Sequence, residues 1–204
     1  MPSRNILKTD VPEAYYHIYA RGSNKQPIFL NEYDYKVFFN LLKRYLSREP
    51  AYDGSGRQYP HLQKELELLC YCLMPNHFHL LVYQTQYKAM ATLMRGVMTS
   101  YSKYFNDAYG RSGPLLESRY KASMITNEAY LLHISRYIHL NPEDWETYPY
   151  SSIQSYIGSE REEWLQINRM MEFFPGALAY KRFVADYEDH KKMLEKTKHK
   201  LADN

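Results

Sequence analysis

The chain has few of the residues that would place it outside the cell. Its 204 residues include only two cysteines, Cys70 and Cys72. They are two positions apart on an expected strand, a spacing at which two side chains do not easily form a disulfide. We therefore expect two small buried thiols in a protein of the reducing cytoplasm, with a Cys-x-Cys metal pair as the alternative.

Long apolar runs are also absent. No stretch approaches the roughly 20 apolar residues that a membrane-spanning helix requires, and residues 1–10 lack the apolar segment of a signal peptide. We expect no membrane partner. With 45% apolar and 24% charged residues, the composition is that of an ordinary globular protein with one sizeable core.

Tyrosine is the residue in excess. Its 22 copies bring the aromatic share of the chain to 16%. A tyrosine ring stacks on bases and its hydroxyl bonds to phosphates, but tyrosine also fills ordinary cores, where we expect most of these residues. A net charge of +3 permits a nucleic-acid partner without arguing strongly for one.

The hydrophobic periodicity predicts a sheet with two intervening helices. Strands are expected at residues 14–21, 66–73, 77–83 and 119–126. The first helix begins after a cap at Asn31 and ends before Pro50, and the second covers about residues 88–109. Strand, helix, strand, strand, helix, strand is the split βαβ order. We therefore predict an α+β, ferredoxin-like fold, in which helices cover one face of a four-stranded antiparallel sheet.

A third helix is expected from Glu128 to about Leu140, where Asn-Pro at 141–142 stops it. The sequence beyond this stop is less regular, with a short helix at 151–157 and a longer one from Pro175 to about Lys196. We divide the chain here, into a domain at residues 1–142 and a helical extension at residues 143–204 that packs on it or trails from it.

Two histidines stand in the segment Met-Pro-Asn-His-Phe-His-Leu-Leu-Val at residues 74–82. The Pro-Asn pair predicts a tight turn, and the run after it predicts a strand. On a strand, His77 and His79 point to the same face. Two adjacent imidazoles form half of a metal site. By itself the pair fits better with histidines on the solvated face of an edge strand.

The expected third helix supplies groups that complement such a pair. His133, Tyr137 and Asn141 are four residues apart and share one helical face. A tyrosine can act as a nucleophile, but it must first be activated, because its ordinary pKa of about 10 keeps the phenol protonated at neutral pH. The residues alone leave open that Tyr137 is one more half-buried tyrosine. Tyr130 is a rival nucleophile.

These segments together resemble one known family. Besides residues 74–82, the chain carries Tyr-Phe-Asn at 104–106, Gly-Arg-Ser-Gly at 110–113, Arg-Tyr-Lys-Ala at 119–122 and Ser-Arg-Tyr-Ile-His-Leu-Asn-Pro at 135–142. In this order they are similar to the HUH single-tyrosine transposases, which are small insertion-sequence enzymes and their REP-associated relatives. The first strand and turn, residues 17–22 and 26–29, look like the same family. The resemblance covers about residues 15–158.

The resemblance implies a metal-dependent enzyme that acts on DNA, with residues 1–142 as its catalytic domain. It implies His77, His79 and Asn141 as ligands of a divalent ion, Mg²⁺ or Mn²⁺, and Tyr137 as the nucleophile. Such enzymes cleave and rejoin single-stranded DNA, usually at the foot of a hairpin, through a 5′-phosphotyrosine intermediate. Many are homodimers and some REP-associated members are monomers, so either assembly is expected here.

Three cationic residues, Arg111, Arg119 and Lys121, are expected to contact DNA phosphates. His133 departs from the family pattern and fits a surface histidine, an extra ligand or a general base. Two alternatives to a transposase stay open. One is a domesticated REP-associated protein that binds or processes repeat hairpins without transposition. The other is a non-catalytic nucleic-acid-binding module of the same fold, whose sheet aromatics stack on bases.

Overall fold

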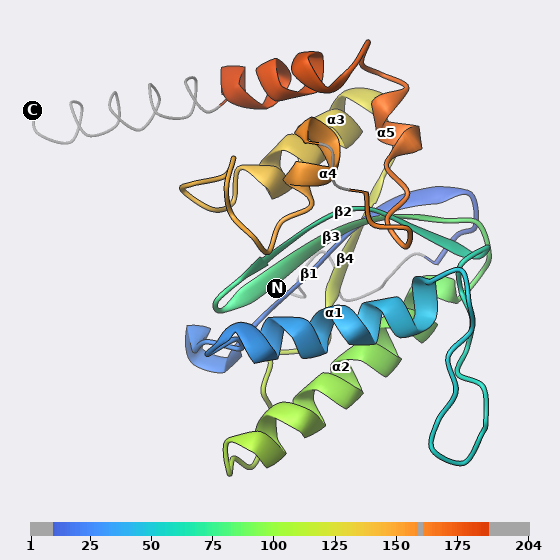
Figure 1. Cartoon of the computed structure of the whole chain (residues 1–204), viewed down its shortest axis with the longest axis vertical. Helices are drawn as coiled ribbons and strands as arrows, with labels where there is room; N and C mark the ends of the chain where they lie inside the picture. The colour runs from blue at the N-terminus through green and yellow to red at the C-terminus, as the bar shows by residue number, and fades with distance from the viewer. Residues whose placement is uncertain (1–9, 159–160, 188–204) are drawn as a thin grey trace, which may run out of the picture.

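The computed structural model describes residues 10–158 and 161–187 and shows a single four-stranded sheet in that part of the chain (Figure 1). Its strands are β1 (Ala14–Arg21), β2 (Leu66–Met74), β3 (His77–Gln84) and β4 (Lys121–Ile125). Their order is β2-β3-β1-β4, and all neighbours are antiparallel. This is the order of the split βαβ arrangement, and it confirms the predicted fold.

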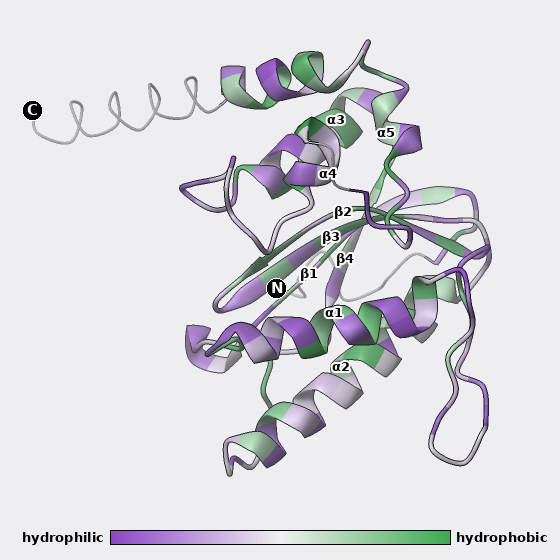
Figure 2. Ribbon diagram, in the orientation of Figure 1, coloured by the Kyte–Doolittle hydropathy of each residue, from purple (hydrophilic) through white to green (hydrophobic). Residues whose placement is uncertain are grey.

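Two crossover helices, α1 (Glu32–Leu46) and α2 (Ala89–Ala108), lie on one face of the sheet, as predicted (Figure 1). Hydrophobic and hydrophilic residues alternate along α1 (Figure 2), and its apolar side packs on the sheet. The rings of Phe38 on α1 and Phe78 on β3 are 5.1 Å apart. Side chains alternate along a strand. Since Phe78 faces α1, His77 and His79 point to the other face of the sheet.

The opposite face is covered by α3 (Glu128–His139), α4 (Ile153–Ile157) and α5 (Asn168–Met171) (Figure 1). The side of α3 that carries Leu131, Ile134 and Ile138 is buried, in keeping with the helical spacing of these residues. The periodicity predicted α3 but did not say which face of the sheet it covers. Its position places the end of α3 over the face that carries the two histidines.

Residues 143–158 and 161–187 share their core with the sheet. Tyr156 and Tyr180 are fully buried, and the Tyr156 hydroxyl donates to the carbonyl of Leu69 on β2 at 2.7 Å. The imidazole of His139 at the end of α3 bonds to the hydroxyls of Tyr180 and Ser152, both at 2.8 Å. This part of the extension therefore packs on the sheet, while the boundary at residue 142 stays a prediction.

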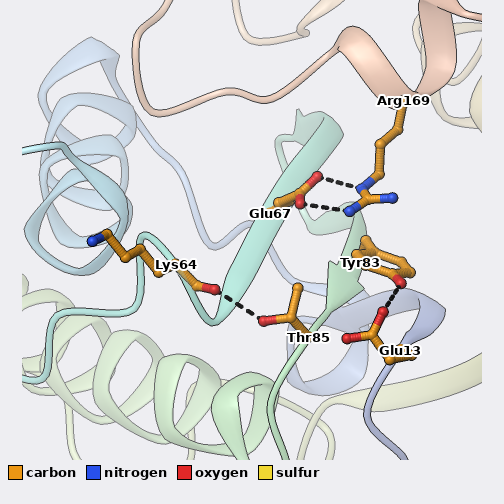
Figure 3. A network of polar contacts seen from close by, with 6 residues as sticks. All are labelled: Glu13, Lys64, Glu67, Tyr83, Thr85 and Arg169. Atoms are coloured by element: carbon orange, nitrogen blue, oxygen red, sulfur yellow. Dashed lines mark hydrogen bonds and ion pairs between the residues drawn. The ribbon is translucent and has the colours of Figure 1, made fainter.

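A second polar contact joins α5 to strands β2 and β3 of the sheet (Figure 3). The guanidinium of Arg169 donates to both carboxylate oxygens of Glu67 on β2, at 2.6 and 3.0 Å. The same guanidinium lies 3.8 Å from the ring centroid of Tyr83 on β3, whose hydroxyl donates to Glu13. A bidentate pair stacked on an aromatic ring is directional, so it sets the position of α5 on the strands.

Several predicted boundaries differ from the structure. Strand β4 is shorter than residues 119–126 because its ladder with β1 ends at the pair Tyr19 and Lys121. The short helix α5 and the 3-10 helix at Ser23–Lys25 were not predicted. The last helix begins at residue 177 and is described to residue 187, so its predicted continuation to Lys196 lies outside the described residues.

Cys70 and Cys72 are buried free thiols, as expected. None of the described helices has the length and apolar character needed to span a membrane.

The bond between Tyr180 and His139 predicts that the extension stabilises the fold. Tyr180→Phe leaves a buried imidazole nitrogen without this partner, which should lower the free energy of unfolding by about 1–3 kcal/mol. Urea denaturation followed by circular dichroism measures the change. Tyr52→Phe is the control, because Tyr52 is 58% exposed. Equal stability of the two variants would contradict this role of the extension.

Candidate active site

His77 and His79 lie together on the face of β3 that α3 covers. Their ring centroids are 5.1 Å apart. His79 is buried, with 6% of its surface exposed, and His77 is half-buried. Tyr137 projects from α3 beside them, with its ring centroid 5.4 Å from that of His79, and it remains 40% exposed. The fold thus brings a reachable phenol to the pair of imidazoles.

Asn141 follows α3 and contacts the first of these histidines. Its Oδ1 lies 2.9 Å from Nε2 of His77. On the other side of the ring, Nδ1 of His77 lies 2.6 Å from Oδ1 of Asn76, in the turn between β2 and β3. The ring of His77 is therefore held between two amides, one from the turn and one from the chain after α3.

These side chains open into a surface pocket. Tyr137, His77 and His79 line it together with residues of β1, of the segment before β4 and of β4 itself: Tyr19, Ala20, Arg21, Glu117, Ser118 and Lys121. Arg21 is exposed and forms no ion pair within residues 10–158 and 161–187. Two cationic side chains, Arg21 and Lys121, thus share a pocket with the phenol of Tyr137.

A third histidine, His17 on β1, lies next to the pair. Its Nε2 is 2.9 Å from Nδ1 of His79, the two rings stack with centroids 5.0 Å apart, and 7% of its surface is exposed. Sequence reasoning did not single out His17, Tyr19 or Arg21 as site residues. Their alternation along β1 indicates that the three side chains share one face of the strand. Their place at the site follows only from the strand register, which pairs Tyr19 with His79 and Arg21 with His77.

Burial keeps these imidazoles neutral. It lowers the pKa of His17 to about 4. Burial, and then the charges of His17, His77 and Arg21, lower the pKa of His79 to about 2. Burial and the charge of Arg21 also lower the pKa of His77, against the opposing effect of its bond to Asn141. The neutral imidazole is the form that binds a metal.

The donor set formed by His77, His79 and Asn141 fits a divalent ion. No group of three or more His, Cys, Asp or Glu residues in the described parts of the chain is arranged to hold a metal, so a full set needs the amide oxygen. Nε2 of His77 and Oδ1 of Asn141 are 2.9 Å apart. Two ligands at right angles, each roughly 2.1 Å from an octahedral ion, would be separated by about 3 Å.

The remaining predicted residues lie elsewhere, except Lys121, which lines the pocket. The guanidinium of Arg111 lies 5.5 Å from the ring centroid of Phe105, away from the pocket lining, and Arg119 is exposed outside that lining. Their contact with DNA stays a prediction. The ring of His133 lies 5.2 Å from that of Tyr187 and outside the pocket lining, and so does the rival nucleophile Tyr130.

Residues 58–141, which include the two histidines, Tyr137 and Asn141, match the model of a family described as "Transposase IS200 like". This part of the chain is similar to the IS200-like transposase family. The match supports a DNA-processing function of the transposase kind at the level of the family. None of the curated proteins matches the sequence.

The chain is also similar to solved structures of transposases. A REP-associated tyrosine transposase bound to a REP hairpin is 13% identical, with a TM-score of 0.55 over 77% of this chain and 91% of that chain. At this identity the likeness shows the fold. A candidate transposase from Deinococcus radiodurans is 16% identical, with a TM-score of 0.40 over 66% of this chain and 95% of that chain.

The donor set predicts that Mn²⁺ stabilises the folded protein. Binding to the native state alone should raise the free energy of unfolding by about 2.7 kcal/mol at a Mn²⁺ concentration roughly 100 times the Kd. Thermal unfolding with and without Mn²⁺ measures this effect, and a chelator should reverse it. The double variant H77A/H79A should show no rise. A rise of the same size in that variant would place the bound ion elsewhere.

Proposed function

We propose that this protein cleaves and rejoins single-stranded DNA through a covalent bond between Tyr137 and a 5′-phosphate. The observation that supports this most is the position of Tyr137, which lies over His79 in a pocket shared with His77. These residues are distant in the sequence, and all of them fall inside the family match at residues 58–141.

Tyr137 would act as the nucleophile. Its side chain is 40% exposed, so a phosphodiester can reach it, while packing of α3 on the sheet fixes its direction. Its Oη would bond to the phosphorus as the bond from phosphorus to the 3′ oxygen breaks. The phenol loses its proton and the leaving 3′ oxygen gains one. Attack by a 3′-hydroxyl on the phosphotyrosine reverses the step, and no nucleotide cofactor is needed because the ester conserves the bond energy.

His77, His79 and Asn141 would hold the divalent ion, Mg²⁺ or Mn²⁺. Two imidazoles favour Mn²⁺ by ligand type. When bound, the ion would supply positive charge that neutralises and orients the scissile phosphate. Asn76 keeps Nδ1 of His77 occupied, so Nε2 is the nitrogen left to coordinate.

Arg21 and Lys121 would contact the phosphate from the sheet side of the pocket. They come from β1 and β4, and both line the pocket beside Tyr137. Charge fixed at the point where a phosphate is attacked stabilises the transition state. The related structure was solved with a REP hairpin. We propose a hairpin-bearing single strand as the substrate here, bound by a monomer or a homodimer.

Trapping of a covalent adduct tests the nucleophile. A labelled hairpin-bearing single strand is incubated with Mn²⁺ and the protein, then resolved on a denaturing gel. The wild type should form a DNA adduct that resists denaturation, and Tyr137→Phe should form none because it lacks the attacking oxygen. Tyr130→Phe is a matched control on the same helix with the same 40% exposure. It should react like the wild type.

Two outcomes would overturn this proposal. An adduct with Tyr137→Phe would show that another residue attacks. Absence of an adduct with the wild type on every repeat sequence tried, with retained DNA binding, would favour the non-catalytic module.

Arg21 gives a separate prediction for the rate of cleavage. Arg21→Ala should slow adduct formation about 10- to 100-fold, corresponding to roughly 1.4–2.8 kcal/mol of transition-state stabilisation. Arg95→Ala, which removes an exposed cation from α2 on the other face of the sheet, is the control for overall charge. Single-turnover rates measure both. An equal effect of the two substitutions would assign Arg21 only a general electrostatic role.

A further inference from the structure

His17 is buried beneath the pocket and does not line it. It stands on β1 opposite Leu81, two pairs along the ladder from the pair formed by Tyr19 and His79. Its Nε2 lies 2.9 Å from Nδ1 of His79, a hydrogen-bond distance between two ring nitrogens. The proposed function gives this residue no role, although a histidine with 7% exposure has lost most of its contact with water.

The direction of this bond decides whether His79 can coordinate. Two neutral imidazoles at this distance share one proton, and there are two ways to place it. If Nδ1 of His79 donates to His17, Nε2 of His79 keeps a lone pair. If His17 donates instead, Nε2 of His79 carries the proton and cannot bind a metal.

The neighbouring histidine shows the same arrangement. Nδ1 of His77 is occupied by Oδ1 of Asn76 at 2.6 Å, and its Nε2 meets Oδ1 of Asn141 at 2.9 Å. Nδ1 of His79 is likewise occupied, by His17. Both rings are therefore engaged at Nδ1 by the protein. Coordination is left to Nε2 in both, and Nε2 of His77 already lies beside the proposed co-ligand Asn141. Ligand histidines usually donate their second N–H to an outer partner in this way.

We propose that His17 is a positioning residue, which accepts the Nδ1 proton of His79 and so presents the Nε2 lone pair of His79 to a divalent ion. This inference rests on the proposed function, because it requires His79 to be a ligand. It assigns to the imidazole of His17 the part that a carboxylate or a backbone carbonyl plays in other metal sites. The consequence is that a residue outside the pocket controls the metal affinity of a residue inside it.

Mn²⁺ binding to the full chain, followed by electron paramagnetic resonance, tests this inference without relying on activity. His17→Leu removes the acceptor at similar volume and should weaken binding about 10- to 100-fold. His17→Gln keeps an acceptor oxygen and should recover most of the loss. His61→Leu is the matched control, because His61 bonds to the carbonyl of Ser47 after α1, outside the pocket. It should bind Mn²⁺ like the wild type.

The outcomes separate this inference from the proposed function. If the wild type binds no Mn²⁺, or His79→Ala binds as tightly as the wild type, the metal site itself is wrong. If His79→Ala loses binding while His17→Leu keeps wild-type affinity, only the role of His17 is overturned. An equal loss in His17→Leu and His17→Gln would also overturn it, because the acceptor would then not matter.

A second measurement covers the case in which His17→Leu does not fold, as judged by circular dichroism. Wild-type protein loaded with Zn²⁺, a diamagnetic ion that imidazoles bind well, is examined by long-range ¹H–¹⁵N correlation of the histidine rings. The inference predicts a proton on Nδ1 of His79 and none on Nε2 of His17. A proton on Nε2 of His17 would overturn it.

Discussion

The packing of α3 on the face of the sheet opposite α1 and α2 is the constraint on which the site depends. Burial of Ile138 fixes the rotation of the helix, and this turns Tyr137 toward the histidines of β3. One turn later, Asn141 reaches His77 at 2.9 Å. A rotation of α3 about its axis would separate the phenol, the amide and the imidazoles, so the chemistry follows from an apolar contact.

Residues that follow the family match, which ends at residue 141, help to hold α3 on the sheet. His139 lies between Tyr137 and Asn141 in the sequence, and its ring bonds to Tyr180 and Ser152 in the extension. The extension thus holds the end of α3 that carries the proposed nucleophile and ligand. On physical grounds the extension is a support for the site as well as part of the core.

The sequence predicted the local elements well, because alternation and helical spacing report directly on burial. The strand at Ala14–Arg21 and the turn before His77 were predicted at their observed positions. The role of His17 and Arg21 was not, because strand register depends on contacts between distant segments. Tyr137 and Asn141 followed from helical spacing together with the family resemblance. Arg111 was part of the same resemblance, but it lies outside the pocket lining. Its position could not be predicted, because a loop residue has no periodicity that indicates its direction.

The central claim is that the residue brought to the histidines by α3 is the one that attacks DNA. Identification of the modified residue tests this most directly. Protein reacted with a hairpin-bearing single strand and Mn²⁺ is digested with nuclease and protease, and the peptides are sequenced by mass spectrometry. The account predicts a nucleotide attached through its 5′-phosphate to Tyr137. A nucleotide on Tyr130, or on any other residue outside the pocket, would contradict it.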